Sequence, residues 1–374
     1  MSLFDPIAFH GRTNPDRLAL AVSDAFAESA TYGDLLRAVH RVARRFETAS
    51  SLRASRVGIV CQNRLLQIAA ALGASLAGVR GILISPDGSF PRADVDAFVT
   101  DSRDTRVEGQ VIQIDGSIFS PGTEPEKPSA RNGETRWRFL PSTAQRVPGT
   151  PYLTEAVLEA RIQQRSRATG GAGDRWLCVA DIRGERGFTS VAAALSSGGA
   201  ALLSNGHWED DCRMMGLYEA GSVFIAAGLL ADYLPTIRAA AMHGMHPRVM
   251  VISGTAFDDK SLVWLKREIS PHISLHLDCP EIGTFAASTH WQLGERVAFW
   301  PLTGTECLVV DNDGRPMAPG TTGTILVKSA GAAAPEPGDP AAGRFRDGWF
   351  ISPWMGSQLP TGALLLSGAR EATS

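Results

Sequence analysis

Residues 56–84, RVGIVCQNRLLQIAAALGASLAGVRGILI, decide the fold class of this chain. Two short apolar runs, 56–60 and 81–84, flank an alanine-rich stretch of helical length at 64–77. Strand, helix and strand at this spacing predict a βαβ unit. The parallel strands of such a unit need helices on both faces of their sheet, so the chain is predicted to be an α/β protein.

Upstream of this unit, the sequence predicts an amphipathic helix. Thr31 followed by Asp34 is a capping-box-like start, because a hydroxyl and a carboxylate three residues apart can satisfy each other's backbone N–H groups. Apolar residues then recur with helical spacing, as the positions Leu35, Leu36, Val39, Val42, Ala43 and Phe46 show.

Downstream, a second α/β stretch follows a polar segment. Residues 115–136, rich in Pro, Ser, Gly and charge, predict an exposed loop. Apolar runs then alternate with helical segments, at 176–180, 200–203, 222–226 and 249–252.

The last part of the chain changes to short strands. Residues 307–310 and 324–327 flank the Asp313-Gly314 turn, and 329–343 is a flexible loop. We therefore expect two α/β subdomains with stacked sheets, at 1–172 and 173–295, and a small β subdomain at 296–374.

Composition narrows the class of protein. Of the 374 residues, 44% are hydrophobic and 20% charged, values typical of a folded soluble protein. The 36 basic residues form no dense run and the net charge is −3, which argues against a nucleic-acid partner. The longest apolar run, 188–203, is interrupted by Ser and Gly, and the five cysteines are far apart in sequence. The predicted location is the cytoplasm, with no membrane partner.

The order of elements and several phrases resemble the N-terminal domain of AMP-forming ligases, the superfamily of acyl-CoA synthetases and adenylation domains. The most specific phrases are VDNDGRPM at 310–317 and FRDGWF at 345–350, supported by 56–60 and by VMVISGT at 249–255. The resemblance implies an acyl-CoA synthetase-like large domain. It also implies carboxylate activation, with ATP or AMP and Mg²⁺ as ligands.

The segment that resembles the phosphate-holding loop of this superfamily departs from the pattern. In STAQRVPGT at 142–150, Ser142 matches, but Thr143 and Arg146 replace glycines and Gly149 replaces a lysine. A side chain at a left-handed glycine position costs roughly 1–2 kcal/mol. A lost lysine removes a charge-assisted contact of about 1.5–3 kcal/mol. We therefore expect this loop not to enclose a triphosphate.

A second resemblance concerns the nucleotide-clamping strand and turn, HLDCPE at 276–281. Glu281 stands where the superfamily has a Glu that helps hold ATP-bound Mg²⁺, so it is the candidate metal ligand. Leu277 replaces an aromatic residue that stacks on adenine, and Pro280 replaces a Thr whose hydroxyl meets the α-phosphate. Together with Asp278 and Cys279, Leu277 makes up the degenerate nucleotide-binding phrase.

A third departure lies near the end of the chain. Trp354 stands where the superfamily has an Asp that binds the ribose hydroxyls, and an indole cannot accept two hydroxyl protons. The resemblance also implies that a small C-terminal domain, with its catalytic lysine, is missing. We assign no catalytic residue.

These departures predict a degenerate ligase domain impaired in ATP-dependent activation, which acts by binding a small carboxylate or acyl ligand or a partner enzyme. One alternative is a divergent active ligase that uses a C-terminal domain supplied in trans. Another is a structural docking subunit of a biosynthetic complex. The resemblance places the acid-binding cleft between the two layers, with five candidate lining residues: Ile182, Phe188, Ser253, Gly254 and Phe285.

Overall fold

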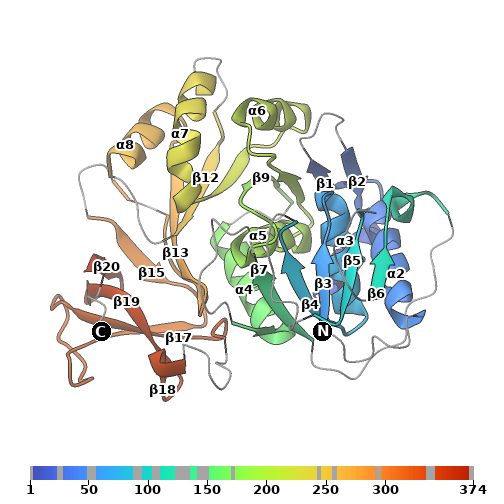
Figure 1. Ribbon diagram of the computed structural model, residues 1–374. Coiled ribbons are helices and arrows are strands. Elements are labelled where there is room, and N and C mark those ends of the chain that lie inside the picture. Colours follow the sequence, from blue (N-terminus) through green and yellow to red (C-terminus); the bar gives the residue numbers. More distant parts are fainter. Residues whose placement is uncertain are drawn as a thin grey trace.

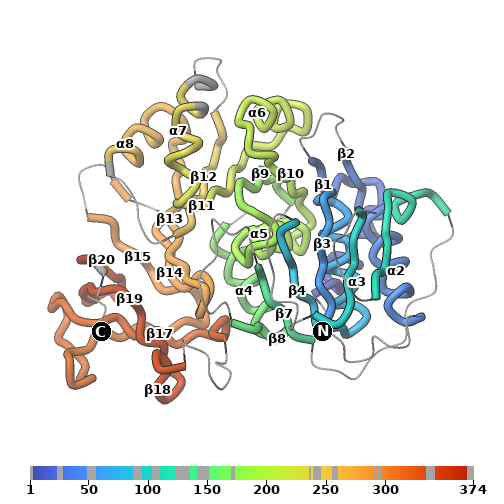
Figure 2. The backbone as a smooth tube through the Cα atoms, viewed as in Figure 1, coloured from blue at the N-terminus to red at the C-terminus, as the bar shows by residue number. Residues whose placement is uncertain are grey.

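The protein has two α/β layers and a β-rich C-terminal part, as a computed structural model shows (Figure 1). The first layer lies beside the green and yellow second layer, and the orange and red β unit lies at the far side (Figure 2). The predicted architecture is confirmed. The structure describes residues 3–22, 28–48, 56–86, 95–102, 110–122, 135–140, 151–169, 173–241, 246–254, 259–289, 291–292, 296–333 and 342–369.

The helices are α1 (Asp5–Thr13), α2 (Tyr32–Thr48), α3 (Arg64–Leu76), α4 (Glu155–Thr169), α5 (Glu185–Ser196), α6 (Trp208–Leu217), α7 (Ala227–Ala241), α8 (Asp259–Glu268) and the short 3₁₀ turns η3 (Gly116–Phe119) and η5 (Ala342–Arg344). The strands of the first layer are β3 (Arg56–Val60), β4 (Arg80–Ile84), β5 (Ala97–Thr100), β6 (Gln110–Gln113), β7 (Arg136–Leu140) and β8 (Leu153–Thr154). The strands of the large sheet are β1 (Leu18–Val22), β2 (Glu28–Thr31), β9 (Arg175–Val179), β10 (Ala200–Leu203), β11 (Ser222–Ala226), β12 (Val249–Gly254), β13 (His272–Cys279), β14 (Gly283–Ser288), β15 (Ala298–Pro301), β16 (Thr305–Val310), β17 (Gly323–Ser329), β18 (Phe345–Arg346), β19 (Trp349–Gln358) and β20 (Leu364–Ala369).

The βαβ unit at 56–84 lies at the centre of the smaller sheet. Its strands run in the order β6-β5-β3-β4-β7-β8, and β3 pairs in parallel with β4, with Val57 opposite Gly81. Helix α3 begins after Asn63, whose side chain accepts hydrogen bonds from the N–H groups of Leu65 and Leu66. The sequence prediction of this unit is therefore confirmed, while β5, β6 and β7 are strands that it did not include.

The large sheet continues from the second layer into the β unit. Its order is β16-β17-β19-β20-β15-β14-β13-β12-β11-β9-β10-β1-β2, with β18 paired to β19. The strands β13, β12, β11, β9 and β10 are parallel neighbours, and the early strand β1 pairs in parallel with β10. The antiparallel pairing of β13 with β14 begins the change to the β unit. The early strands β1 and β2 thus lie in the large sheet.

The start of α2 has the predicted capping geometry. The Thr31 hydroxyl donates to Asp34 Oδ2 at 2.7 Å, and the backbone N–H of Asp34 donates back to Thr31 Oγ1 at 3.2 Å. Farther along, α2 packs tightly on α3. A Cβ added at Gly73 would lie 2.7 Å from Val42 Cγ1, which explains why glycine stands at this helix crossing.

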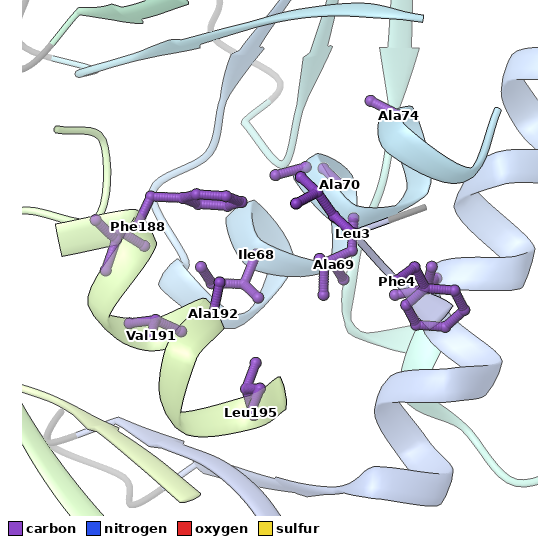
Figure 3. Packing of buried hydrophobic residues seen from close by; sticks show 14 of the residues in the cluster. Leu3, Phe4, Ile68, Ala69, Ala70, Ala74, Phe188, Val191, Ala192 and Leu195 are labelled. Carbon is purple, nitrogen blue, oxygen red and sulfur yellow. The ribbon is translucent and has the colours of Figure 1, made fainter. Parts of the chain in front are cut away.

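Two hydrophobic clusters cover the two faces of the large sheet. Because side chains alternate along a strand, Phe224 of β11 faces the first layer, while Val223 and Ile225 face the opposite side. Between the layers, α3 and α5 face each other through small and apolar side chains (Figure 3). Ala69 and Ala70 of α3 and Ala192 of α5 belong to this cluster. Among the described residues, no helix is long and apolar enough to cross a membrane.

Candidate functional site

The candidate site lies where the parallel strands β12 and β13 end and α5 begins. Asp278, the next-to-last residue of β13, is buried at this edge. Arg186, in the first turn of α5, holds it in a bidentate ion pair. Its Nε donates to Asp278 Oδ2 at 2.8 Å and its Nη2 to Oδ1 at 2.7 Å. This pair joins α5 to β13 across the position where the sequence predicts a ligand cleft.

The first turn of α5 is positioned by glycine. A Cβ added at Gly187 would lie 2.1 Å from the carbonyl oxygen of Asp181, so no larger residue fits without a shift of the backbone. This close approach brings the start of the helix over the turn that follows β9. Arg186, one residue earlier, is thereby held beside Asp278.

A second arginine, from another helix, reaches the same carboxylate. Arg165 of α4 is buried, and its Nη2 lies 3.5 Å from Asp278 Oδ2. Its Nη1 donates to the Ser253 hydroxyl at 3.4 Å, and that hydroxyl in turn donates to Asp278 Oδ2. The guanidinium also stacks over the Phe224 ring, 4.8 Å from its centroid. Four elements, α4, α5, β12 and β13, therefore meet at Asp278.

The electrostatics of this cluster favour charged arginines and an ionised Asp278. Burial alone would raise the pKa of Asp278, but the guanidiniums of Arg186 and Arg165 outweigh it and hold that pKa below its usual value. Burial lowers the pKa of Arg165, whereas the Asp278 carboxylate raises that of Arg186. His276, two residues before Asp278, has its pKa lowered to about 3 by burial and by Arg165, so its ring is neutral at pH 7.

A third buried arginine lies one helical turn from Arg165. Arg161 donates from Nε to the carbonyl oxygen of Gly331 at 2.8 Å, and its Nη1 lies 3.5 Å from Glu185 Oε1. Arg161 and Arg165 share the inner face of α4 with Leu158 and Ile162. The sequence analysis did not select these two arginines. The available signal was their helical spacing, since the four positions 158, 161, 162 and 165 recur on one face.

Glu281, the candidate metal ligand, is already paired within the chain. Arg344 Nη1 donates to Glu281 Oε1 at 2.7 Å, and the Arg344 guanidinium stacks 4.8 Å from the Phe350 ring centroid. In the part of the chain that the structure describes, no group of three or more His, Cys, Asp or Glu side chains gathers to hold a metal ion. The Glu281 carboxylate is thus engaged by Arg344, and Mg²⁺ held there would take its remaining oxygen ligands from nucleotide phosphates and water.

The other nucleotide-directed residues are placed as follows. Leu277 is fully buried in the cluster on the outer face of the large sheet, and burial raises the pKa of the neighbouring Cys279 thiol. Trp354 of β19 is 5% exposed and packs on Phe285, with ring centroids 5.3 Å apart. These side chains present no open surface to a base or sugar. Ser142, Thr143 and Arg146 lie outside the described residues.

Of the five predicted cleft residues, the structure brings Ser253 to Asp278. Phe188 instead points between the layers, where it lies 6.0 Å from the Trp137 ring and 5.6 Å from the Phe139 ring. Ile182 is buried in the same inter-layer cluster, and Phe285 packs on the opposite face of the large sheet. Gly254 lies at the end of β12, where an added Cβ would lie 2.6 Å from the Ala227 Cβ.

A small cavity adjoins Arg165 between α4, α5 and the large sheet. It has room for about one water molecule. Its lining combines polar and apolar side chains: Arg165, Thr169, Ser190, Ser197, Trp176, Phe224, Cys178, Ala193 and Ala194.

Comparison with known proteins agrees with this fold. Residues 8–113 match the family described as AMP-binding enzyme. No match was found among curated proteins. Among solved structures, VinN superposes with a TM-score of 0.82 at 18% identity, covering 98% of this chain and 99% of VinN.

Two further structures extend the likeness. A double mutant of o-succinylbenzoate CoA synthetase (MenE) from Bacillus subtilis, bound to a product analogue, has a TM-score of 0.79 at 18% identity and covers 98% of this chain and 78% of that one. The N-terminal subdomain of Klebsiella oxytoca NpsA, in complex with 3-hydroxyanthranilyl-AMSN, has a TM-score of 0.80 at 15% identity and covers 98% of each chain. This chain therefore shares the fold of these solved structures, and its segment 8–113 matches the AMP-binding enzyme family.

Proposed function

We propose that this chain is an adenylation-type domain that binds a small carboxylate or acyl ligand and is impaired in ATP-dependent activation of that ligand. The observation that carries the proposal is the pairing of Asp278 and Glu281 with arginines of the same chain. These two residues lie in the segment expected to clamp ATP and its Mg²⁺. Their carboxylates are engaged internally, and Trp354 is packed on Phe285.

Ligand binding is supported by the chemistry of similar structures and of this cleft. VinN has been solved with L-aspartate, and the NpsA subdomain with 3-hydroxyanthranilyl-AMSN. In this chain, Arg165 and Arg186 both lie beside Asp278, and guanidinium groups favour carboxylates through paired, charge-assisted hydrogen bonds. A carboxylate ligand therefore suits the residues that remain. All five cysteines are buried free thiols, which supports a cytoplasmic location as part of the same proposal.

Carboxylate-dependent exchange of pyrophosphate into ATP tests the loss of activation. If the contacts missing at Gly149, Pro280 and Trp354 each remove about 2 kcal/mol of transition-state stabilisation, the rate falls on the order of 10⁴-fold. The chain should show no exchange above background, and Gly149→Lys alone should not restore it. Exchange that depends on one acid and disappears in Glu281→Ala would refute the proposal and identify a divergent active ligase.

Calorimetric titration tests the binding half of the proposal. A panel of carboxylates is titrated into the chain with and without ATP–Mg. We expect heat from at least one small acid, with an affinity that ATP–Mg does not change, because the nucleotide-directed residues are engaged internally. An acid that binds only in the presence of ATP–Mg would show that nucleotide binding is intact.

A further inference from the structure

We propose that Arg64 and Asp211 form a proton-controlled latch between the two layers. Ionised Asp211 holds Arg64, and with it the start of α3, against the loop that follows β10, and protonated Asp211 loosens this contact. The latch lies where α3, β10, α6 and α7 meet and includes none of the residues around Asp278, so this inference goes beyond the proposed function. Three observations support it: a contact between the layers, a chain of hydrogen bonds that leads from this contact, and the charges around that chain.

The contact between the layers is made by Arg64. This residue begins α3 of the first layer, and its Nη1 donates to the carbonyl oxygen of Ser204, 140 positions away in the sequence. Ser204 directly follows β10 of the large sheet, and its own N–H donates to the carbonyl oxygen of Cys178 in β9 at 3.2 Å. Arg64 therefore joins the start of a first-layer helix to the carboxyl ends of two parallel strands of the second layer.

A chain of hydrogen bonds leads from this contact to Asp211. The Ser204 hydroxyl donates to Asp211 Oδ2 at 2.5 Å and accepts from the backbone N–H of Gly206 at 3.1 Å. It also lies 3.0 Å from the Tyr233 hydroxyl of α7, which is the donor because the Ser204 hydrogen is already used. Asp211 is fully buried, and its Oδ1 has no hydrogen-bond partner among the described residues. Ser204 thus connects a cation of the first layer to a buried carboxyl of the second.

Arg64 supplies the positive charge that acts on this carboxyl. Burial raises the pKa of Asp211 to about 6, which the hydroxyl bond and the charge of Arg64 only partly offset, and the neighbouring Asp210 raises it further. The other titratable groups beside it, Tyr233 and Cys212, are neutral near pH 7, because burial raises the pKa of each. The charge of this cluster therefore changes at Asp211.

Proton binding at Asp211 should therefore alter the contact between the layers. A carboxylate attracts the Arg64 guanidinium strongly where little water screens the charges, whereas a protonated carboxyl has no charge to attract it. A cation that lowers a pKa is, by linkage, held more firmly once the proton has left. The contact should be firm at about pH 8 and loose at about pH 5.

A double-mutant cycle tests the latch. Arg64→Met, Asp211→Asn and the double variant are unfolded in urea at pH 5 and at pH 8. At pH 8, the effects of the two changes on the unfolding equilibrium constant should be coupled by about fivefold or more, and at pH 5 by less than about twofold.

Arg56 and Asp96, an ion pair within the first layer, supply the matched control cycle. The backbone N–H and the guanidinium of Arg56 hold the pKa of Asp96 below its usual value, so this carboxylate is ionised at both pH values. The coupling between Arg56→Met and Asp96→Asn should therefore be the same at pH 5 and at pH 8.

Hydrogen exchange, followed by mass spectrometry, locates the effect. After correction for the intrinsic pH dependence of exchange, the amides of 64–67 and 204–206 should exchange about fivefold faster at pH 5 than at pH 8 in the wild type. In Asp211→Asn, the corrected rates should be equal at the two pH values. Histidine also titrates in this range, so His207→Gln, at the exposed start of α6, is the control and should behave like the wild type.

Three results would overturn the latch. The first is coupling between Arg64 and Asp211 that is equal at the two pH values, whether large or absent. The second is a pH dependence of exchange that persists in Arg64→Met, which decides the question even if Asp211→Asn does not fold. The third is a pH dependence that disappears in His207→Gln. None of these measurements uses an acid or ATP, so failure of the latch leaves the proposed function intact.

Discussion

Replacing Asp211 by Asn should change how the stability of the protein depends on pH. Asp211 lies in α6 and is fully buried. The Ser204 hydroxyl donates to its Oδ2, while its Oδ1 has no hydrogen-bond partner within the described part of the chain. Burial raises the pKa of this carboxyl from 3.8 to about 6, which the bond from Ser204 only partly offsets.

The sign of the effect follows from proton linkage. Because the folded-state pKa is the higher one, the folded protein holds a proton that the unfolded chain releases between about pH 4 and pH 6. The contribution of Asp211 to stability is therefore complete below that window and is lost as the pH rises through it. A shift of about 2 units corresponds to about 3 kcal/mol in the free energy of unfolding.

Urea unfolding, followed by tryptophan fluorescence from pH 4.5 to 7.5, measures this difference. Asn has nearly the same volume and stays neutral, so the free energy of unfolding of Asp211→Asn minus that of the wild type should increase with pH up to about 6.5 and then level off. A constant difference across this pH range would refute the assigned titration.

Three further outcomes are expected. Trp354→Ala should lower the free energy of unfolding, measured by urea unfolding, by about 3–5 kcal/mol, as for other buried aromatic residues. Trp300→Ala, at a half-exposed position, is the control and should change it by about 0.5 kcal/mol or less. Near-equal losses would show that Trp354 is not packed as described. Burial raises the pKa of all five cysteine thiols. A thiol reagent at pH 7.5 should therefore label no cysteine in the native protein and five in urea. Rapid labelling of the native chain would contradict this burial. Glu281→Gln should lower the free energy of unfolding by about 1 kcal/mol, because it weakens the pair with the partly exposed Arg344. Adding Mg²⁺ should leave the melting temperature of the wild type and of this variant unchanged. An increase in the wild type alone would establish Glu281 as a metal ligand.

Much of the α/β framework was predictable because it depends on local patterns. The apolar runs at 56–60, 200–203 and 222–226 coincide with β3, β10 and β11. A buried parallel strand needs a continuous apolar run, and that requirement is visible in a window of five residues. Other strands carry weaker signals. The segment 110–113, which forms β6, is largely exposed and polar at both ends, so its own sequence does not separate it from a loop.

The residues of the candidate site also differ in how far the sequence alone could predict them. The replaced residues Leu277, Pro280 and Trp354 could be read from the sequence, because each differs in chemistry from what the resemblance requires of a nucleotide contact. The arginines could not be selected in this way. In sequence, an arginine on a helix is most often a solvated surface residue, and burial of its charge depends on a partner supplied by another element.

Sequence alone therefore indicated the strands and helices that have strong local patterns, and the positions whose chemistry departs from the phrases it resembles, since both depend on neighbours along the chain and on side-chain chemistry. The tertiary structure alone decided that β1 and β2 join the large sheet through the pairing of β1 with β10, and that Arg165 and Arg186 meet at Asp278. Arg186 and Asp278 are 92 positions apart. Their contact exists because the packing of α4 and α5 on the sheet removes water from that point, and no local pattern encodes that packing.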